Sequence, residues 1–478
     1  VTVEVTLIGE AAAKYKLKAG EETFTISGTI NKAYPNLTVS LSETTCTVGE
    51  KLLPLLSVSS APEDAAVTYY YTQYQTLAGD SEYEGSDVVP AIDENTAISE
   101  PGTYYVYAKS SGTKNYDEER SDTVELTVNK AVVKAASVTK ADGTDGGTYE
   151  SLPAALNAAQ DGDTVKLLAN HTTNWSDVEG GEYATLAVVR KTLTLDLNGM
   201  TVDYLTVGDV VPDEEGGILD SYDGNLTVVD NIQGGSCGKI KNLEFVKGSL
   251  AIQGGRIGDF DGSKLTCKEN SGTVTISGGT VCNATVGDGA TVTVTGGTGH
   301  AGTWCNDGTL NITGGTLTAS ARNTVLSQFG EVHIGASAHL MAAGEGKSAV
   351  QLIGAKMTLS GDAVLSGNGG IDVFNSNRNE EGTVSAQVEI TGGRIETKDF
   401  PVSGNNQESA GAEVAITGGS LKNISGGTAI YWPMEGQLTI GGNAVIEGGT
   451  GIEAKMGTIT IKDNAVITGS GEWKEEKP

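Results

Sequence analysis

The sequence predicts an all-β protein in which a long parallel β-solenoid follows a smaller β-sandwich, and three observations support that fold class. A strand-like segment closed by a glycine pair recurs every 18 residues, starting at 273, 291 and 309. A unit this short cannot fold alone, so the copies must stack. Of the 478 residues, 66 are glycine and 10 proline, which suits tight corners between strands. Aromatic residues make up only 5% of the chain, so the interior is narrow and aliphatic.

Within each repeat, apolar and hydroxyl side chains alternate along the strand. Thr273-Val-Thr-Ile-Ser-Gly-Gly is followed by Thr291-Val-Thr-Val-Thr-Gly-Gly and Thr309-Leu-Asn-Ile-Thr-Gly-Gly. A period of two residues predicts that the aliphatic side chains are buried and the threonines face water. Each strand is therefore expected to lie above its counterpart in the preceding coil.

The charge of the chain excludes several partners. Its formal net charge is −30, and nucleic acid and anionic membranes both require a positive surface. A membrane-spanning helix needs about 18 consecutive apolar residues, and no such run occurs. We therefore expect neither nucleic-acid binding nor membrane insertion in this chain, which starts at Val1 and which we expect to be an excised piece of a longer protein.

The N-terminal part has two segments that end alike. Residues 1–33 end in Asn-Lys-Ala and are predicted to be the end of a first module or a short β segment. Residues 34–131 contain strand-like runs separated by turns, the pattern of a small β-sandwich. The stretch Pro101-Gly-Thr-Tyr-Tyr-Val-Tyr-Ala108, with Asn115-Tyr116 and the ending Leu126-Thr-Val-Asn-Lys-Ala131, resembles bacterial immunoglobulin-like surface modules. That resemblance implies a stalk or spacer on a cell-surface protein.

Residues 132–189 are predicted to be a linker and the cap of the solenoid. A single convincing helix begins after Ser151, carries Pro153 in its first turn and ends before Gly162. Such a helix would cover the open end of the first coil. The run Ser151-Leu-Pro-Ala-Ala-Leu-Asn-Ala-Ala-Gln-Asp-Gly-Asp-Thr-Val165 resembles the entry segment of right-handed parallel β-helix proteins of the pectate-lyase-like superfamily.

Residues 190–468 are predicted to form a right-handed parallel β-helix of about twelve coils, with the handedness taken from the rule for parallel crossovers. Residues 469–478 are expected to be a polar tail. One buried residue per coil serves as an anchor for the repeated strand: Leu197, Val228, Ile252, Ile276, Val294, Ile312, Ile334, Leu359, Ile390, Ile416, Ile440 and Ile461.

A second strand in each coil brings candidate ligand-binding residues together. Its outward positions align as Gln351, Asp372, Ser403, Tyr431 and Glu453, and long turns follow in three consecutive coils. Loops on a rigid scaffold are where binding residues concentrate. Amide, carboxylate and aromatic side chains suit sugar hydroxyls and ring faces. The candidate residues are Asp372, Asn375, Asn377, Arg378, Asn405, Tyr431 and Trp432, although strand alternation also allows Trp432 to point into the coil.

The sequence offers no clear catalytic or metal site. Along that outward stripe Asp372 and Glu453 are three coils apart, or roughly 14 Å, which is too far for the carboxyl pair of a glycosidase. Asp259 and Asp261 resemble part of a calcium loop but lack further ligands, and a solvated turn is the alternative. Calcium remains possible, and no other cofactor is expected. Five scattered cysteines, Cys46, Cys237, Cys267, Cys282 and Cys305, indicate buried thiols rather than disulfides or a zinc site.

Together, these expectations predict a bacterial adhesin-like protein that is secreted or displayed on the cell surface. We expect it to be a monomer whose β-helix binds a glycan or a host glycoprotein. The alternative is a polysaccharide lyase or glycoside hydrolase on the same scaffold, as the superfamily resemblance implies. A remote alternative is ice binding, because Thr-x-Thr rungs could order water. Asn311 already breaks that threonine column.

Overall fold

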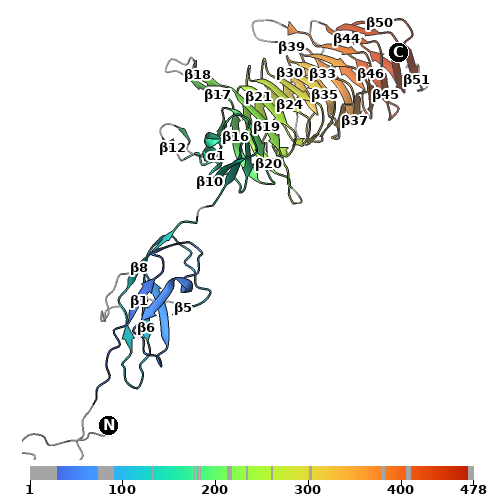
Figure 1. Ribbon diagram of the computed structural model, residues 1–478. Helices are drawn as coiled ribbons and strands as arrows, with labels where there is room; N and C mark the ends of the chain where they lie inside the picture. The colour runs from blue at the N-terminus through green and yellow to red at the C-terminus, as the bar shows by residue number, and fades with distance from the viewer. Residues whose placement is uncertain are drawn as a thin grey trace, which may run out of the picture. The chain divides into compact units, whose positions relative to one another are not determined.

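A computed structural model gives the fold (Figure 1) and describes residues 30–73, 91–131, 133–176, 178–179, 182–183, 185–212, 218–232, 235–259, 262–300, 304–377, 383–404 and 411–471. The chain divides into two compact units, residues 1–132 and 133–478. This boundary lies one residue beyond the predicted end of the sandwich module at 131.

The first unit contains a small two-stranded sheet and a six-stranded sheet, both mainly antiparallel. The two-stranded sheet pairs β1 with β3, and the six-stranded sheet has the order β2-β8-β6-β4-β5 with β7 paired to β6. The elements are β1 (Thr38–Leu41), β2 (Thr45–Thr47), the 3-10 helix η1 (Leu53–Leu55), β3 (Leu56–Ser59), β4 (Val67–Thr72), β5 (Ala91–Ile92), β6 (Gly102–Ser110), β7 (Glu119–Arg120) and β8 (Val124–Asn129). The immunoglobulin-like resemblance stays a prediction, and residues 1–29 lie outside the described part of the chain.

A 15-stranded sheet forms one face of the second unit. β9 (Ala136–Thr139) pairs antiparallel with β10 (Asp145–Tyr149) on one side and with β11 (Thr164–Leu167) on the other. From β11 onward, every strand pairs parallel with the next one. Figure 1 shows them as successive rungs. The parallel strands are β11 (Thr164–Leu167), β15 (Thr192–Asp196), β19 (Gly224–Val229), β21 (Gly248–Ile252), β24 (Gly272–Ile276), β27 (Thr291–Val294), β30 (Thr309–Ile312), β33 (Glu331–Ile334), β36 (Lys356–Leu359), β41 (Gln387–Ile390), β44 (Ala412–Ile416), β47 (Gly436–Ile440) and β50 (Thr458–Ile461).

The register of this sheet confirms the predicted stacking of the anchors from Val228 onward. The expected burial was wrong for the last anchor, because Ile461 on the final strand of the sheet is 55% exposed. Val228 pairs with Ile252, Ile252 with Ile276, and the series continues without a slip to Ile440 and Ile461. The first anchor was wrong by two residues, because Val228 pairs with Leu195 and not with Leu197. Parallel stacking also begins earlier than residue 190, since β11 pairs with β15.

A 22-stranded sheet supplies the other strands of each coil. It begins with β14 (Ala187–Val189), β16 (Thr201–Val207) and β20 (Lys239–Phe245), and then continues as two rows of stacked strands. We count the 15-stranded sheet as the first row and call these two the second and third rows. The second row is β22 (Arg256–Ile257), β25 (Thr280–Val281), β28 (Thr298–His300), β31 (Thr316–Ala319), β34 (His339–Ala342), β37 (Val364–Gly367), β42 (Arg394–Thr397), β45 (Ser420–Asn423), β48 (Val445–Gly448) and β51 (Val466–Gly469).

The third row lies after the second row in each coil. Its strands are β23 (Leu265–Cys267), β26 (Ala284–Val286), β29 (Trp304–Asn306), β32 (Val325–Gln328), β35 (Ser348–Ile353), β38 (Gly369–Phe374), β43 (Val402–Gly404), β46 (Thr428–Trp432) and β49 (Thr450–Ala454). Three hairpins leave the coils: β12 (Val178–Glu179) with β13 (Glu182–Tyr183), β17 (Asp209–Pro212) with β18 (Ile218–Tyr222), and β39 (Ser376–Asn377) with β40 (Thr383–Val384). The long parallel sheets are consistent with a parallel β-helix.

The predicted helix is α1 (Leu152–Ala158), and it begins as the sequence indicates. The Ser151 hydroxyl accepts a hydrogen bond from the Ala154 N–H at 3.2 Å, and Pro153 occupies the first turn. Leu152, Ala155 and Leu156 are buried in the same aliphatic core as the strands. The helix therefore covers apolar surface at the N-terminal end of the second unit.

The described cysteines are free thiols. Cys46, Cys267 and Cys282 are buried, whereas Cys237 is exposed, so the expectation of burial was wrong for Cys237. Burial alone raises the pKa of the Cys267 thiol to about 12, which keeps it protonated and unreactive at neutral pH. The side chain of Cys305 lies outside the described residues.

His171 is expected to make the stability of the second unit depend on pH. Its imidazole is buried, and its Nε2 atom has no hydrogen-bond partner among the described residues. Burial lowers the pKa of His171, and a backbone hydrogen bond with Thr185 and the charge of Asp203 only partly oppose that shift. The folded state therefore binds a proton less readily than the unfolded chain, whose histidine has a pKa of about 6.5.

We expect the free energy of unfolding to fall as pH decreases from 7.5 to about 5.5, because protonation favours the unfolded chain. The measurement is the melting temperature of wild type and His171→Gln across that interval. The variant should show a flatter pH dependence whatever its absolute stability. Equal slopes for the two proteins would contradict this role of His171.

Candidate functional site

The candidate site lies on the outward positions of the third row of strands. The register pairs Gln351 with Asp372, Asp372 with Ser403, Ser403 with Tyr431 and Tyr431 with Glu453. The stripe aligned from the sequence is therefore confirmed as one continuous column. Strand alternation places these side chains away from the core, while Ile371, Val402 and Ile430 beside them are buried.

Two aromatic rings and two charged side chains lie together at the C-terminal part of this column, and we call them the Tyr431 cluster: Tyr431 and Glu453 of the column, with Phe400 and Lys455 beside it. The Phe400 and Tyr431 rings are stacked, with centroids 5.1 Å apart and planes inclined by 21°. The Lys455 ammonium lies 5.1 Å from the Tyr431 ring centroid and 3.8 Å from a Glu453 carboxylate oxygen. The hydrogen bond with Tyr431 raises the pKa of Lys455, so its ammonium stays charged.

Asp372 lies two strands from Tyr431 and is held by two hydroxyls. Ser348 Oγ donates to Asp372 Oδ2 at 2.6 Å, and Ser403 Oγ donates to Oδ1. The carboxylate is half-buried, so it keeps part of its accepting capacity toward solvent. Asp372 is therefore fixed in position and still accessible to a ligand hydroxyl.

The structure removes two predicted residues from this surface. Asn375 is buried, and its Oδ1 accepts a hydrogen bond from the Ala386 N–H at 3.1 Å, so it secures the base of the β39–β40 hairpin. Trp432 is 0% exposed and belongs to the aliphatic core, as the alternative interpretation proposed. Asn377 is a residue of β39 whose side chain is not described, and Arg378 and Asn405 lie outside the described residues.

Of the two weak calcium candidates, Asp259 and Asp261, only Asp259 lies among the described residues. Asp259 forms ion pairs with Lys239 and, at 2.9 Å, with Arg256, so its oxygens already face two cations. Asp261 lies outside the described residues. Within the described ranges, no group of three or more His, Cys, Asp or Glu side chains could hold a metal ion.

Sequence reasoning missed a depression of about 430 Å³ on the outward face of the 15-stranded sheet. It lies on strands β33, β36, β41, β44 and β47, and its side chains include Lys356, Gln387, Glu389, Glu413 and Gln437. Glu389 and Glu413 are exposed residues on adjacent strands, with Glu413 paired to Gln387. Glu389 directly precedes anchor Ile390, and Glu413 lies three residues before anchor Ile416, so the outward positions of these two strands would have located both carboxylates.

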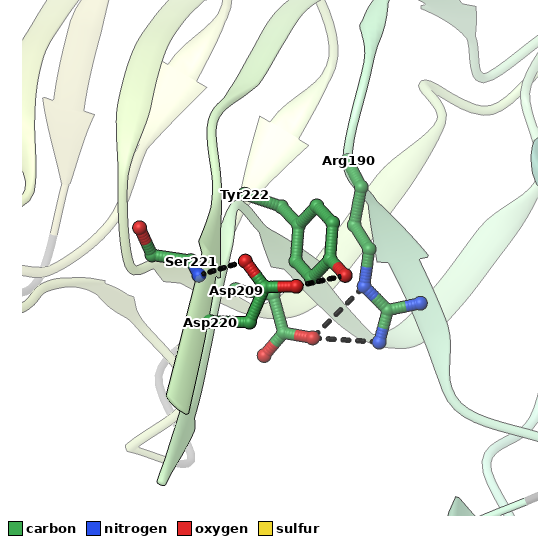
Figure 2. Close-up of polar contacts among 5 residues, drawn as sticks. All are labelled: Arg190, Asp209, Asp220, Ser221 and Tyr222. Atoms are coloured by element: carbon green, nitrogen blue, oxygen red, sulfur yellow. Dashed lines mark hydrogen bonds and ion pairs between the residues drawn. The ribbon is translucent and has the colours of Figure 1, made fainter. Parts of the chain in front are cut away.

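The insertion after residue 207 contains the hairpin β17–β18. Figure 2 shows Arg190 donating from Nε and Nη2 to Asp209 Oδ2, at 2.8 and 2.6 Å. On β18, Asp220 accepts from the Tyr222 hydroxyl at 2.5 Å and from the Ser221 N–H at 2.8 Å. The Arg190–Asp209 ion pair fastens the hairpin to the coil, whereas the Asp220 contacts lie within β18.

No protein-family model matches the chain, and neither the curated proteins nor the solved structures include a significant match. No helix among the described residues is both long and apolar enough to cross a membrane.

Proposed function

We propose that this chain is an adhesin-like protein, secreted or displayed on a bacterial surface, that binds a glycan or glycoprotein at the Tyr431 cluster. In this proposal the second unit is a right-handed β-helix of about twelve coils. Residues 34–131 form an immunoglobulin-like module that serves as part of a stalk.

The observation that carries the proposal is the half-buried Phe400–Tyr431 stack beside Glu453, Lys455 and Asp372. Partly exposed aromatic carbon suits the apolar face of a sugar ring, and the carboxylates and ammonium suit its hydroxyls. The rigid ladder of parallel strands fixes their spacing, so little conformational entropy is lost on binding. A net charge of −30 favours neutral glycans over acidic ones.

A glycan array probed with the full chain tests the proposal. Tyr431→Ala should lower the apparent affinity for the glycans bound by wild type by about five- to thirtyfold, because an aromatic contact on a desolvated ligand contributes about 1–2 kcal/mol. Tyr222→Ala on β18 is the matched control and should bind like wild type. Binding that survives Tyr431→Ala unchanged would place the ligand elsewhere.

A second candidate function is glycoside hydrolysis in the depression. Its premise is the pair Glu389 and Glu413, whose Cα atoms are roughly 8 Å apart from the strand spacing and the two-residue offset. The carboxyl groups of glycosidase pairs are about 5–9.5 Å apart, a separation that side chains on adjacent strands can reach. The same glycans, assayed for new reducing ends, separate the two functions: release that Glu413→Gln abolishes would favour the enzyme.

A further inference from the structure

The outward column of the third row extends far beyond the Tyr431 cluster. From Tyr431 toward the N-terminus it continues in register to Glu244 on β20. These pairings span eight strand spacings, so Glu244 and Tyr431 are roughly 38 Å apart along the stack. The column is therefore long enough to hold an extended polymer.

A second aromatic group lies at the N-terminal part of the same column, and we call it the Trp175 cluster: Trp175, Tyr204, Glu244 and Lys268. The rings of Trp175 and Tyr204 meet edge to face, with centroids 5.1 Å apart. The Tyr204 hydroxyl donates to Glu244 Oε2 at 2.6 Å, and Lys268 Nζ lies 2.6 Å from Glu244 Oε1. Trp175 is 50% exposed, although burying an indole would be favourable.

The two clusters have the same chemical composition. Each joins an aromatic pair to one glutamate and one lysine, and in each the lysine lies within 4 Å of the glutamate carboxylate. Trp432 shows that this solenoid can enclose an indole completely when packing requires it. Half of the Trp175 side-chain surface faces solvent beside the Tyr204 ring, and a ligand could contact that exposed part.

Between the clusters the column carries mainly hydrogen-bonding side chains. Thr266, Thr285, Gln351 and Asp372 are each half-buried, and Gln351 accepts a hydrogen bond from Asn323 Nδ2 at 2.9 Å. Each of these four residues lies on a different strand, and neighbouring strands are about 4.8 Å apart. Cys305 on β29 and Leu326 on β32 interrupt the series, and Ser403 on β43 is buried. A pyranose residue in an extended chain has a length similar to the strand spacing, so sugars of one chain could meet the polar residues on either side of this interruption.

We propose that the Trp175 cluster is a second glycan-contact site and that one extended, neutral polysaccharide chain lies along the column and contacts both clusters. This inference rests on the proposed function and adds the class of ligand, which is a long chain rather than a terminal sugar. A rigid scaffold that holds two weak contacts on one ligand makes the second contact intramolecular. The resulting gain in apparent affinity is about 10²–10⁴-fold when the ligand spans both sites.

The test compares short and long chains of one linkage. Soluble cellulose derivative, xylan, mannan and amylose are each paired with the short oligosaccharide of the same linkage, and binding to the full chain is measured by calorimetry. Wild type should bind one of the long chains at least about tenfold more tightly, per chain, than its short oligosaccharide. Trp175→Ala should remove that gain while leaving the short oligosaccharide bound at the Tyr431 cluster. Tyr222→Ala, with a matched melting temperature, is the control.

The outcomes separate this inference from the proposed function. Equal affinity for short and long chains, or a gain that survives Trp175→Ala, overturns the second site while glycan binding at the Tyr431 cluster stands. A gain lost in Trp175→Ala and in Tyr431→Ala alike supports the two-site arrangement. Absence of binding to every chain by wild type overturns both.

Discussion

Replacing Trp432 by alanine should lower the free energy of unfolding by about 3–5 kcal/mol, the cost of emptying a large buried aromatic site. Trp432 is among the largest side chains that are fully buried, in an interior made mostly of Val, Ile and Leu. A Cβ atom on Gly457 would lie 2.9 Å from its Nε1 atom, so a glycine in the next coil makes room for the indole. The surrounding rungs are bonded on both sides and cannot collapse into the void.

Two further variants make this prediction specific. Tyr431→Ala alters the adjacent residue on the opposite face of β46 and should cost much less, because that ring is only half-buried. Trp432→Phe keeps much of the volume and removes an N–H that has no hydrogen-bond partner among the described residues. Urea unfolding of the three variants is the measurement, with Trp432→Phe expected between wild type and Trp432→Ala. A loss below about 1 kcal/mol for Trp432→Ala would show that the residue is not part of a packed core.

Apart from the first anchor, the sequence predicted the register of stacked strands correctly wherever apolar residues alternate regularly and one face of the strand is buried. Ile252, Ile276 and their successors stack in the predicted register because a slip by one residue would expose every aliphatic side chain. The error at Leu197 has a related cause. Leu193, Leu195 and Leu197 alternate and are all buried, but the strand ends at Asp196, so counting from the last leucine shifts the anchor by two. A two-residue shift keeps the same face and leaves no trace in the sequence pattern.

The sequence could predict residues of the candidate site only where they lie on strands, because alternation is the signal that places them. The column through Asp372, Ser403 and Tyr431 followed from alternation. The same alternation allowed Trp432 to lie inside, and its burial shows that naming it as a contact residue was wrong. Asn375 follows β38 directly, and its residue type gave no sign that its amide would cap a hairpin instead of facing a ligand. Phe400 and Lys455 were missed because each lies outside the strand pattern and reaches Tyr431 from a neighbouring coil.

The glycine pairs that mark the repeat are required by contacts between coils as well as by backbone conformation. Gly297 has a φ of +74°, and a Cβ atom there would lie 2.8 Å from the Gly279 carbonyl oxygen of the preceding coil. That oxygen accepts a hydrogen bond from the Thr298 N–H at 2.9 Å, and Gly297 O accepts from the Thr316 N–H of the following coil at 3.1 Å. A side chain at this corner would push apart rungs that are bonded on both sides.

Gly297→Ala should therefore destabilise the protein far more than Gly346→Ala, whose site has a φ of +63° and no atom within 4 Å of the added methyl group. Both variants place alanine in a left-handed conformation, at a cost of about 1–2 kcal/mol. Only Gly297→Ala adds the overpacking penalty of about 1–3 kcal/mol. Urea midpoints measured with unchanged m-values give the comparison. Equal midpoints would mean that the corner glycines serve backbone conformation alone and that the coils can separate locally without loss of stability.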